Sequence, residues 1–153
     1  MTDLEHYSLV GFSALSNIEL YQILRLRSAV FVLEQNCAYQ DMDDLDQGAL
    51  HLFKNSDSDQ IIAYARILKP EQCGNNHVSI GRVVVDQAHR AQHLGKELMQ
   101  QATVQTKKLY ADQPIIISAQ TYLSRFYQDL GYVNTGEFYL EDDIPHQKMI
   151  YQA

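Results

Sequence analysis

The stretch VVVDQAHRAQHLGKELM, at Val83–Met99, runs from three β-branched residues through a polar turn into a helical pattern. It predicts a strand, a connection, and a helix that begins near His93 or Leu94 and includes Gly95. The first main-chain N–H groups of a helix have no partner within the helix, and the helix dipole attracts anions to them. The connection could therefore bind a phosphate group. Connections with a single glycine are also common without any ligand, so both interpretations remain open at this point.

The rest of the chain alternates between strand-like and helix-like patterns, and no repeat or linker divides its 153 residues. Strands are expected at 7–12, 51–55, 60–70, 77–86, 114–118, 131–138 and 146–152, and helices at about 17–34, 94–109 and 122–130. The apolar run Pro114–Ser118 is typical of a strand buried on both faces, and a helical crossover makes it parallel to the strand at 77–86. Residues 1–153 are expected to form a single mixed α+β domain.

Helical spacing indicates which side of each helix is buried. In the first helix, Arg27 falls on the same stripe as apolar residues. In the second, Leu98 and Leu109 lie near one apolar stripe, whereas Gln101 is expected to face mostly toward water.

Composition narrows the class of partner. The formal net charge is −7 and Lys and Arg are not clustered, which argues against a nucleic acid or an anionic membrane surface and favours a cationic or amine-bearing partner. The sequence has neither a signal-peptide pattern nor an apolar run of the roughly 18 residues that a membrane span needs, so a cytoplasmic location is expected. Cys37 and Cys73 lack the spacing of a zinc site or a disulfide framework and are interpreted as free thiols.

The extended stretch RVVVDQAHRAQHLGKELM resembles the acetyl-CoA signature of the GNAT superfamily of N-acetyltransferases, Q/R-x-x-G-x-G/A. Arg90 matches the opening residue, Leu94 the apolar position and Gly95 the closing glycine. His93 stands where the middle glycine is expected. This departure concerns how closely the main chain approaches a pyrophosphate, because glycine best tolerates both unusual dihedral angles and a nearby ligand.

A second stretch, AQTYLSRFYQDLGYVNTGE, is similar to the A-x-x-F-Y-x-x-x-G-F block of the same superfamily. Phe126, Tyr127, Gly131 and Tyr132 fall in register with it, and two motifs in the right order are more specific than either alone. The resemblance implies that Tyr127 lies near the coenzyme sulfur and acts as a general acid, a role open to a phenol with a pKa near 10. The alternative is that Phe126 and Tyr127 only pack the last helix.

Further segments, including RSAVFVLEQNCAYQDMDDLD, IAYARIL and IPHQKM, resemble the ElaA branch of the superfamily over about residues 15 to 150. The resemblance implies the GNAT acyltransferase fold, with a central, mostly antiparallel mixed sheet of about six or seven strands flanked by about four helices. It implies that acetyl-CoA is bound, with the pantetheine on one strand, the pyrophosphate on the loop and a polar contact before the last helix. The residues concerned are Val83, Val84 and Val85; Arg90, Ala91, Gln92, His93, Leu94, Gly95 and Lys96; and Gln120.

Removing a proton from the attacking amine requires a base or a water chain. Glu34 and His146 are the candidate bases. His146 follows a proline beside the carboxylates of Glu141 and Asp142, where an exposed surface histidine is the alternative.

The acidic loop QDMDDLDQG, at 40–48, lacks the glycine and the glutamate of an EF-hand calcium loop. It is either a solvated acidic surface or a mouth that attracts a cationic amine, in which Asp41 and Asp43 bind the acceptor. Arg66 is expected to pair with a carboxylate of the protein or of the substrate. His89 and His93 lack the glutamate of a zinc-binding HExxH motif, so no metal is expected.

The sequence therefore predicts an N-acetyltransferase that passes an acetyl group from acetyl-CoA directly to a primary amine of a small molecule or peptide. The alternative is a non-catalytic module that binds coenzyme A as a sensor on the same fold, and the histidine at position 93 keeps it open. The fold often pairs through its late strands, so a homodimer is a further expectation of the resemblance.

Overall fold

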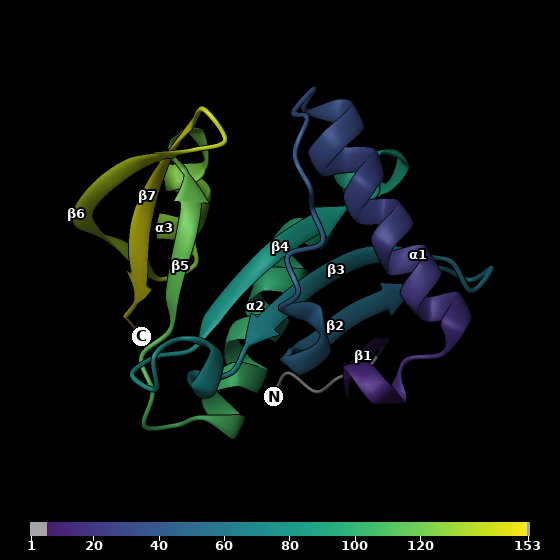
Figure 1. The fold of residues 1–153 in the computed structure, drawn as a ribbon, viewed down its shortest axis with the longest axis horizontal. Helices are drawn as coiled ribbons and strands as arrows, with labels where there is room; N and C mark the ends of the chain where they lie inside the picture. The colour runs from purple at the N-terminus through teal and green to yellow at the C-terminus, as the bar shows by residue number, and fades with distance from the viewer. Residues whose placement is uncertain (1–5, 153) are drawn as a thin grey trace.

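Two antiparallel sheets diverge from a common point in the computed structural model, which describes residues 6–152 (Figure 1). The elements follow the predicted order: β1 (Tyr7–Gly11), α1 (Asn17–Arg27), β2 (Leu50–Asn55), β3 (Ile61–Leu68), β4 (Ser79–Val85), α2 (Leu94–Leu109), β5 (Ile116–Gln120), α3 (Ser124–Asp129), β6 (Tyr132–Glu141) and β7 (Ile144–Tyr151). A π-helical segment, Ser28–Glu34, continues α1 to the predicted end of the first helix. The predicted mixed fold is confirmed.

The first sheet has the strand order β1-β2-β3-β4 and the second the order β5-β7-β6. They meet at a parallel bridge between Val78 and Ile115, where the Ile116 amide donates to the carbonyl of Val78 over 2.9 Å. The predicted parallel pairing is confined to this bridge. Beyond it β4 and β5 separate, so the edges that face each other are not joined into one continuous sheet (Figure 1).

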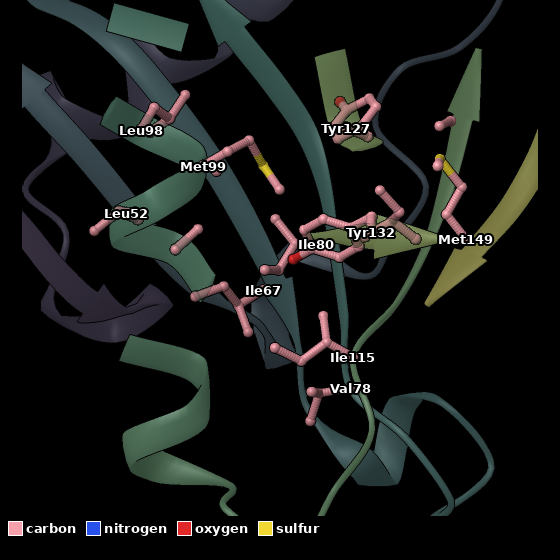
Figure 2. Close-up of a cluster of buried hydrophobic side chains, with 14 of the residues drawn as sticks. Leu52, Ile67, Val78, Ile80, Leu98, Met99, Ile115, Tyr127, Tyr132 and Met149 are labelled. Carbon is pink, nitrogen blue, oxygen red and sulfur yellow. The ribbon is translucent and has the colours of Figure 1, made fainter. Parts of the chain in front are cut away.

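Hydrophobic residues cover both faces of the first sheet. Strand β3 is buried along nearly its whole length, because α2 packs on one face and α1 on the other. On the α2 side, Leu98 and Met99 meet Leu52 and Ile67 of the sheet (Figure 2). The same core continues through Tyr127, Tyr132 and Met149 into the second sheet. The core therefore fixes the angle between the two sheets.

Local signals fix the ends of two helices. Ser16 and Glu19 form a capping box at the start of α1: each side chain accepts a hydrogen bond from the other residue's main-chain N–H, at 3.0 and 2.8 Å. Gly131 ends the α3 segment with a φ of 96°, and a Cβ atom there would lie 2.9 Å from Tyr151. The glycine of the second motif is therefore required by both its backbone conformation and its neighbour.

Two positions in α2 differ from the helical prediction. Gln101 is 6% exposed rather than directed to water, and Leu109 is 53% exposed rather than buried. Leu109 is the last residue of the helix, and the next residue, Tyr110, packs against the core in its place.

Leu98→Ala is expected to lower the free energy of unfolding by about 2–5 kcal/mol, because the side chain is fully buried and its removal leaves a cavity. Leu109→Ala, on the same helix, is the matched control and should change it by less than about 0.5 kcal/mol. Urea unfolding of both variants measures the difference. Equal losses would contradict the assignment of the buried face of α2.

Candidate active site

The connection from β4 to α2 adopts a conformation that a glycine would adopt easily. A short 3₁₀ segment, Gln87–Gln92, leads to His93, which has a φ of 58° and a ψ of 22°, and α2 begins at the next residue. The histidine side chain is exposed and does not cap the helix. The first N–H groups of α2 are therefore not satisfied by that side chain, and the histidine keeps the left-handed turn that the middle glycine of the motif would supply.

Arg90, in this connection, is fixed from two sides. Its guanidinium forms a bidentate pair with Glu34, at 2.5 and 2.8 Å, and its Nε donates to the carbonyl of Val85 over 3.2 Å. The hydrogen bond from Arg90 lowers the pKa of Glu34. Arg90, predicted to bind the coenzyme, is thus paired with Glu34, predicted to be a base. A carboxylate with a lowered pKa holds a proton poorly at neutral pH, which makes Glu34 a weaker base.

A cavity of about 410 Å³ lies where β4 and β5 separate. Gly81, Arg82 and Val83 of β4 form one wall, and Ile117–Gln120 of β5 forms the facing wall. Five of the residues predicted for the site line the cavity: Asp43, Val83, Gln120, Tyr127 and His146. The others predicted from the sequence do not line it: Glu34, Asp41, Arg66, Val84, Val85, Arg90, Ala91, Gln92, His93, Leu94, Gly95 and Lys96.

The β4 wall contains a bulge that the strand pattern did not predict. Tyr64 pairs with Val84 and Arg66 with Gly81, so Arg82 and Val83 share the single position opposite Ala65. Arg82 has a φ of 49°. The extra residue of a bulge is left out of the ladder, which turns part of the β4 main chain away from β3. Glycine inside a strand often marks a bulge, so Gly81 was the available signal.

Tyr127 is 8% exposed and lines the cavity from α3. Its ring meets Phe126 and Tyr132 edge-on, with centroids 5.1 and 6.1 Å away. Burial, and to a smaller extent Tyr122, raises the pKa of Tyr127 to about 12, so the phenol stays protonated at neutral pH. Within residues 6–152 no group hydrogen-bonds to its hydroxyl, which leaves this oxygen available to a ligand in the cavity.

His146 is buried in β7 rather than exposed. Its Nδ1 lies 2.7 Å from the carbonyl of Ile144, and because a carbonyl only accepts, Nδ1 carries the proton. The other ring nitrogen, Nε2, lies 3.4 Å from a carboxylate oxygen of Glu141. The imidazole also stacks on Tyr139. A neutral His146 therefore presents a lone pair at Nε2, which a base requires.

In the acidic loop, the carboxylates of Asp41, Asp43 and Asp46 pair with arginines. Arg27 is fully buried and its Nε and Nη1 contact Asp41 and Asp46 at 2.7 and 2.8 Å. Arg66 pairs with Asp43 and Asp46 at 2.8 and 2.9 Å. Its guanidinium therefore binds carboxylates of the protein, one of the two kinds of partner expected for it. Burial opposes ionisation of Asp43, but the hydrogen bonds and charge of Arg66 outweigh it and lower its pKa to about 2.

No group of three or more His, Cys, Asp and Glu residues in the described part of the chain is arranged to hold a metal ion. Cys37 and Cys73 are free thiols, as predicted. None of the helices in residues 6–152 has the length and apolar character of a membrane span.

The family model of the acetyltransferase (GNAT) domain matches residues 5–153, nearly the whole chain. The chain therefore belongs to the GNAT family, and it has the fold and the family motifs of an acyltransferase.

Its relatives place it near a particular group of this family. The protein ElaA of Escherichia coli is 44% identical over 138 residues, which cover 88% of each chain, and its crystal structure gives a TM-score of 0.88 over 95% of this chain and 98% of that one. An acyl-CoA N-acyltransferase from Pseudomonas aeruginosa is 40% identical, with a TM-score of 0.87 over 95% of this chain and 99% of that one.

A more distant structure shares the fold alone. It is an aminoglycoside 6′-N-acetyltransferase complexed with coenzyme A, at 16% identity and a TM-score of 0.66 over 94% of this chain and 95% of that one.

His93→Gly is expected to be more stable than His93→Ala by about 1 kcal/mol, because glycine takes a positive φ without the steric cost that alanine meets. Urea unfolding of the two variants, which both lack the imidazole, isolates the backbone effect. Identical midpoints would show that position 93 is not held in the left-handed conformation in solution.

Proposed function

We propose that this protein is an acetyl-CoA-dependent N-acetyltransferase that passes the acetyl group directly to a primary amine of a small molecule or peptide. One observation carries the proposal: β4 residues at its open edge and Tyr127 line the same cavity, in a chain that belongs to the GNAT family. Val83, which precedes the first motif, and Tyr127 of the second motif thus line one cavity, while residues 90–96 of the first motif lie outside its lining.

The gap between the two diverging sheets would hold the coenzyme. The pantetheine amides would pair with the main chain of β4 in the gap that β5 leaves, beside Val83. The pyrophosphate would lie at the N–H groups of residues 90–96, at the start of α2. Gln120, whose side-chain amide reaches Gln35 at 3.5 Å, would supply a polar contact from the opposite wall.

The transfer needs one bond to form and one to break. The amine nitrogen attacks the thioester carbonyl carbon, and the resulting tetrahedral intermediate collapses with loss of the thiolate. Main-chain N–H groups that the bulge at Arg82 leaves out of the ladder would stabilise the developing oxyanion. Tyr127 would then give its proton to the departing sulfur and recover it from solvent.

The raised pKa of Tyr127 does not preclude this role. A thiol has a pKa of about 8.5 in water, so transfer from a phenol with a pKa of about 12 is uphill if both are compared in this way. The same apolar surroundings that disfavour the phenolate also disfavour a thiolate beside it. The direction of proton transfer therefore depends on the difference between the pKa of the phenol and the pKa of the thiol within the cavity, not on their values in water.

His146 is the better supported of the two candidate bases. It lines the cavity with its Nε2 unprotonated when neutral, and Glu141 would stabilise the imidazolium that forms after it takes a proton. Glu34 lies outside the cavity lining and is held by Arg90. Positioning of the amine against the thioester contributes in addition, since proximity can supply roughly 7 to 11 kcal/mol.

The acceptor would approach through the carboxylate-bearing part of the cavity. Asp43, Glu141 and Asp142 line it, and Arg82 is the arginine among the lining residues. This charge pattern suits a cationic amine that loses its proton only in the cavity. Asp41 and Arg66, also expected to bind the acceptor, would shape this region through their ion pairs instead.

The direct test is release of free thiol from acetyl-CoA in the presence of polyamines, amino acids, aminoglycosides, peptide N-termini and lysyl peptides. At least one amine is expected to raise thiol release above the rate of hydrolysis without amine, with one acetylated amine detected by mass spectrometry for each thiol. Tight binding of acetyl-CoA without turnover of any amine would support the non-catalytic module.

Tyr127→Phe is expected to lower kcat by about 100-fold or more on the best amine, because the proton donor is lost while the ring and its packing remain. Tyr110→Phe is the control, since Tyr110 lies against the core outside the cavity lining. Steady-state thiol release measures both. An unchanged kcat for Tyr127→Phe rules out the general-acid role.

A further inference from the structure

The bulge in β4 has an unfavourable backbone conformation at its centre. Arg82 carries a Cβ atom, yet its φ of 49° lies in the left-handed region that non-glycine residues avoid. Such a conformation persists only where surrounding contacts hold it, and residues of this kind gather at functional sites. Arg82 and its neighbours Gly81 and Val83 line the cavity, so the strained residue lies where the thioester is proposed to bind.

The side chain of Arg82 is tied to the acidic loop at several points. Its Nε donates to Asp41 Oδ1 over 2.7 Å, and its Nη2 donates to the main-chain carbonyl of Asp41 over 2.9 Å. A weaker contact of 3.3 Å runs from Nη2 to Asp43. The guanidinium also lies over the ring of Tyr39, 5.9 Å from its centroid.

Asp41 is itself held in place by hydrogen bonds from Arg27 and Tyr39. Its second carboxylate oxygen accepts a 2.7 Å hydrogen bond from Nε of the fully buried Arg27, on α1. The hydroxyl of Tyr39 donates to Oδ1, the same oxygen that Arg82 contacts, over 3.1 Å. Asp41 is 6% exposed and thus connects the buried side of α1 to the strand that carries the bulge.

We infer that Asp41 and Arg82 form a clamp that holds the β4 bulge in the conformation that the acyl transfer requires. Arg82 is then a positioning residue: its side chain acts through its own backbone, which turns the main chain of residues 81–83 toward the cavity. This inference rests on the proposed function, because the bulge matters to catalysis only if the thioester carbonyl lies against it.

The alternative role for Arg82 is direct contact between its guanidinium and the substrate. Two substitutions separate the roles, because Arg82→Ala and Arg82→Gly both remove the guanidinium. Alanine disfavours a positive φ, whereas glycine visits positive and negative φ about equally readily. The positioning role therefore predicts different effects for the two variants, and the contact role predicts the same effect.

Arg82→Ala is expected to lower kcat by about 5- to 30-fold, because the bulge conformation becomes a minor one without the clamp. Arg82→Gly should lower it by about twofold only, since about half of the population retains the positive φ. KM for acetyl-CoA should change less than kcat in both, because the proposed pyrophosphate contacts at 90–96 are untouched and only the pantetheine pairing beside Val83 is near the bulge. Hydrogen exchange at the amides of residues 81–84 should be faster in the alanine variant than in the glycine variant.

Equal kcat losses in the two variants would overturn the clamp, and so would equal amide exchange. Thermal unfolding of both variants shows whether the folded fraction differs, and kcat is expressed per folded enzyme. If the wild-type protein turned over no amine, the proposed function would fail, and the exchange comparison alone would then decide whether Arg82 holds the bulge.

Discussion

The separation of β4 from β5 is the constraint on which the rest of the site depends. A single parallel bridge, Val78 with Ile115, joins the two sheets, and the strands part directly after it. Two strand edges that would otherwise pair with each other then face a cavity of about 410 Å³. An open edge normally invites association with another chain, but here it lies inside the molecule, where an extended ligand of limited width can reach it.

Three aspartates of the acidic loop beside this opening are paired with arginines and do not form an uncompensated negative surface. The chain carries a net charge of −7, yet Asp41, Asp43 and Asp46 are each held by arginines from α1, β3 or β4. Buried ion pairs contribute little net stability, since desolvation offsets most of the attraction, but breaking one partner is costly. The network therefore specifies the path of the acidic loop more than it strengthens the fold, and that path shapes one side of the cavity.

Much of the fold could be predicted from periodicity. The order of strands and helices and the strand-to-helix connection at His93 follow from local patterns. The prediction that the run Pro114–Ser118 is buried on both faces is wrong: β5 lies at the edge of its sheet, and Ser118 is exposed while Ile117 and Ala119 on the other face are buried. The parting of β4 and β5 could not be predicted in this way, because a strand edge looks the same in sequence whether or not it is paired. Leu109 shows a second limit: helical spacing assigns a face, but the helix end determines whether that face still meets the core.

The motif residues Tyr127 and Val83 could be predicted by resemblance, and both line the cavity. The partners of Arg27, Arg66 and Arg82 could not, because sequence spacing does not give the distance between a loop and three separate elements. Arg27 on an apolar helical stripe was a signal that a buried cation needed acidic partners, and Gly81 was a signal for the bulge.

The strand order of the second sheet has a consequence for biosynthesis. Its middle strand is β7, Ile144–Tyr151, the last strand of the chain, and β5 and β6 each pair with it rather than with each other. The first sheet uses strands that follow one another in sequence and can assemble while the rest is still being translated. The second sheet cannot begin to assemble before β7 is made, because β5 and β6 pair only with β7. Tyr127 and His146 therefore line one cavity only after β7 has been synthesised and has paired with β5 and β6.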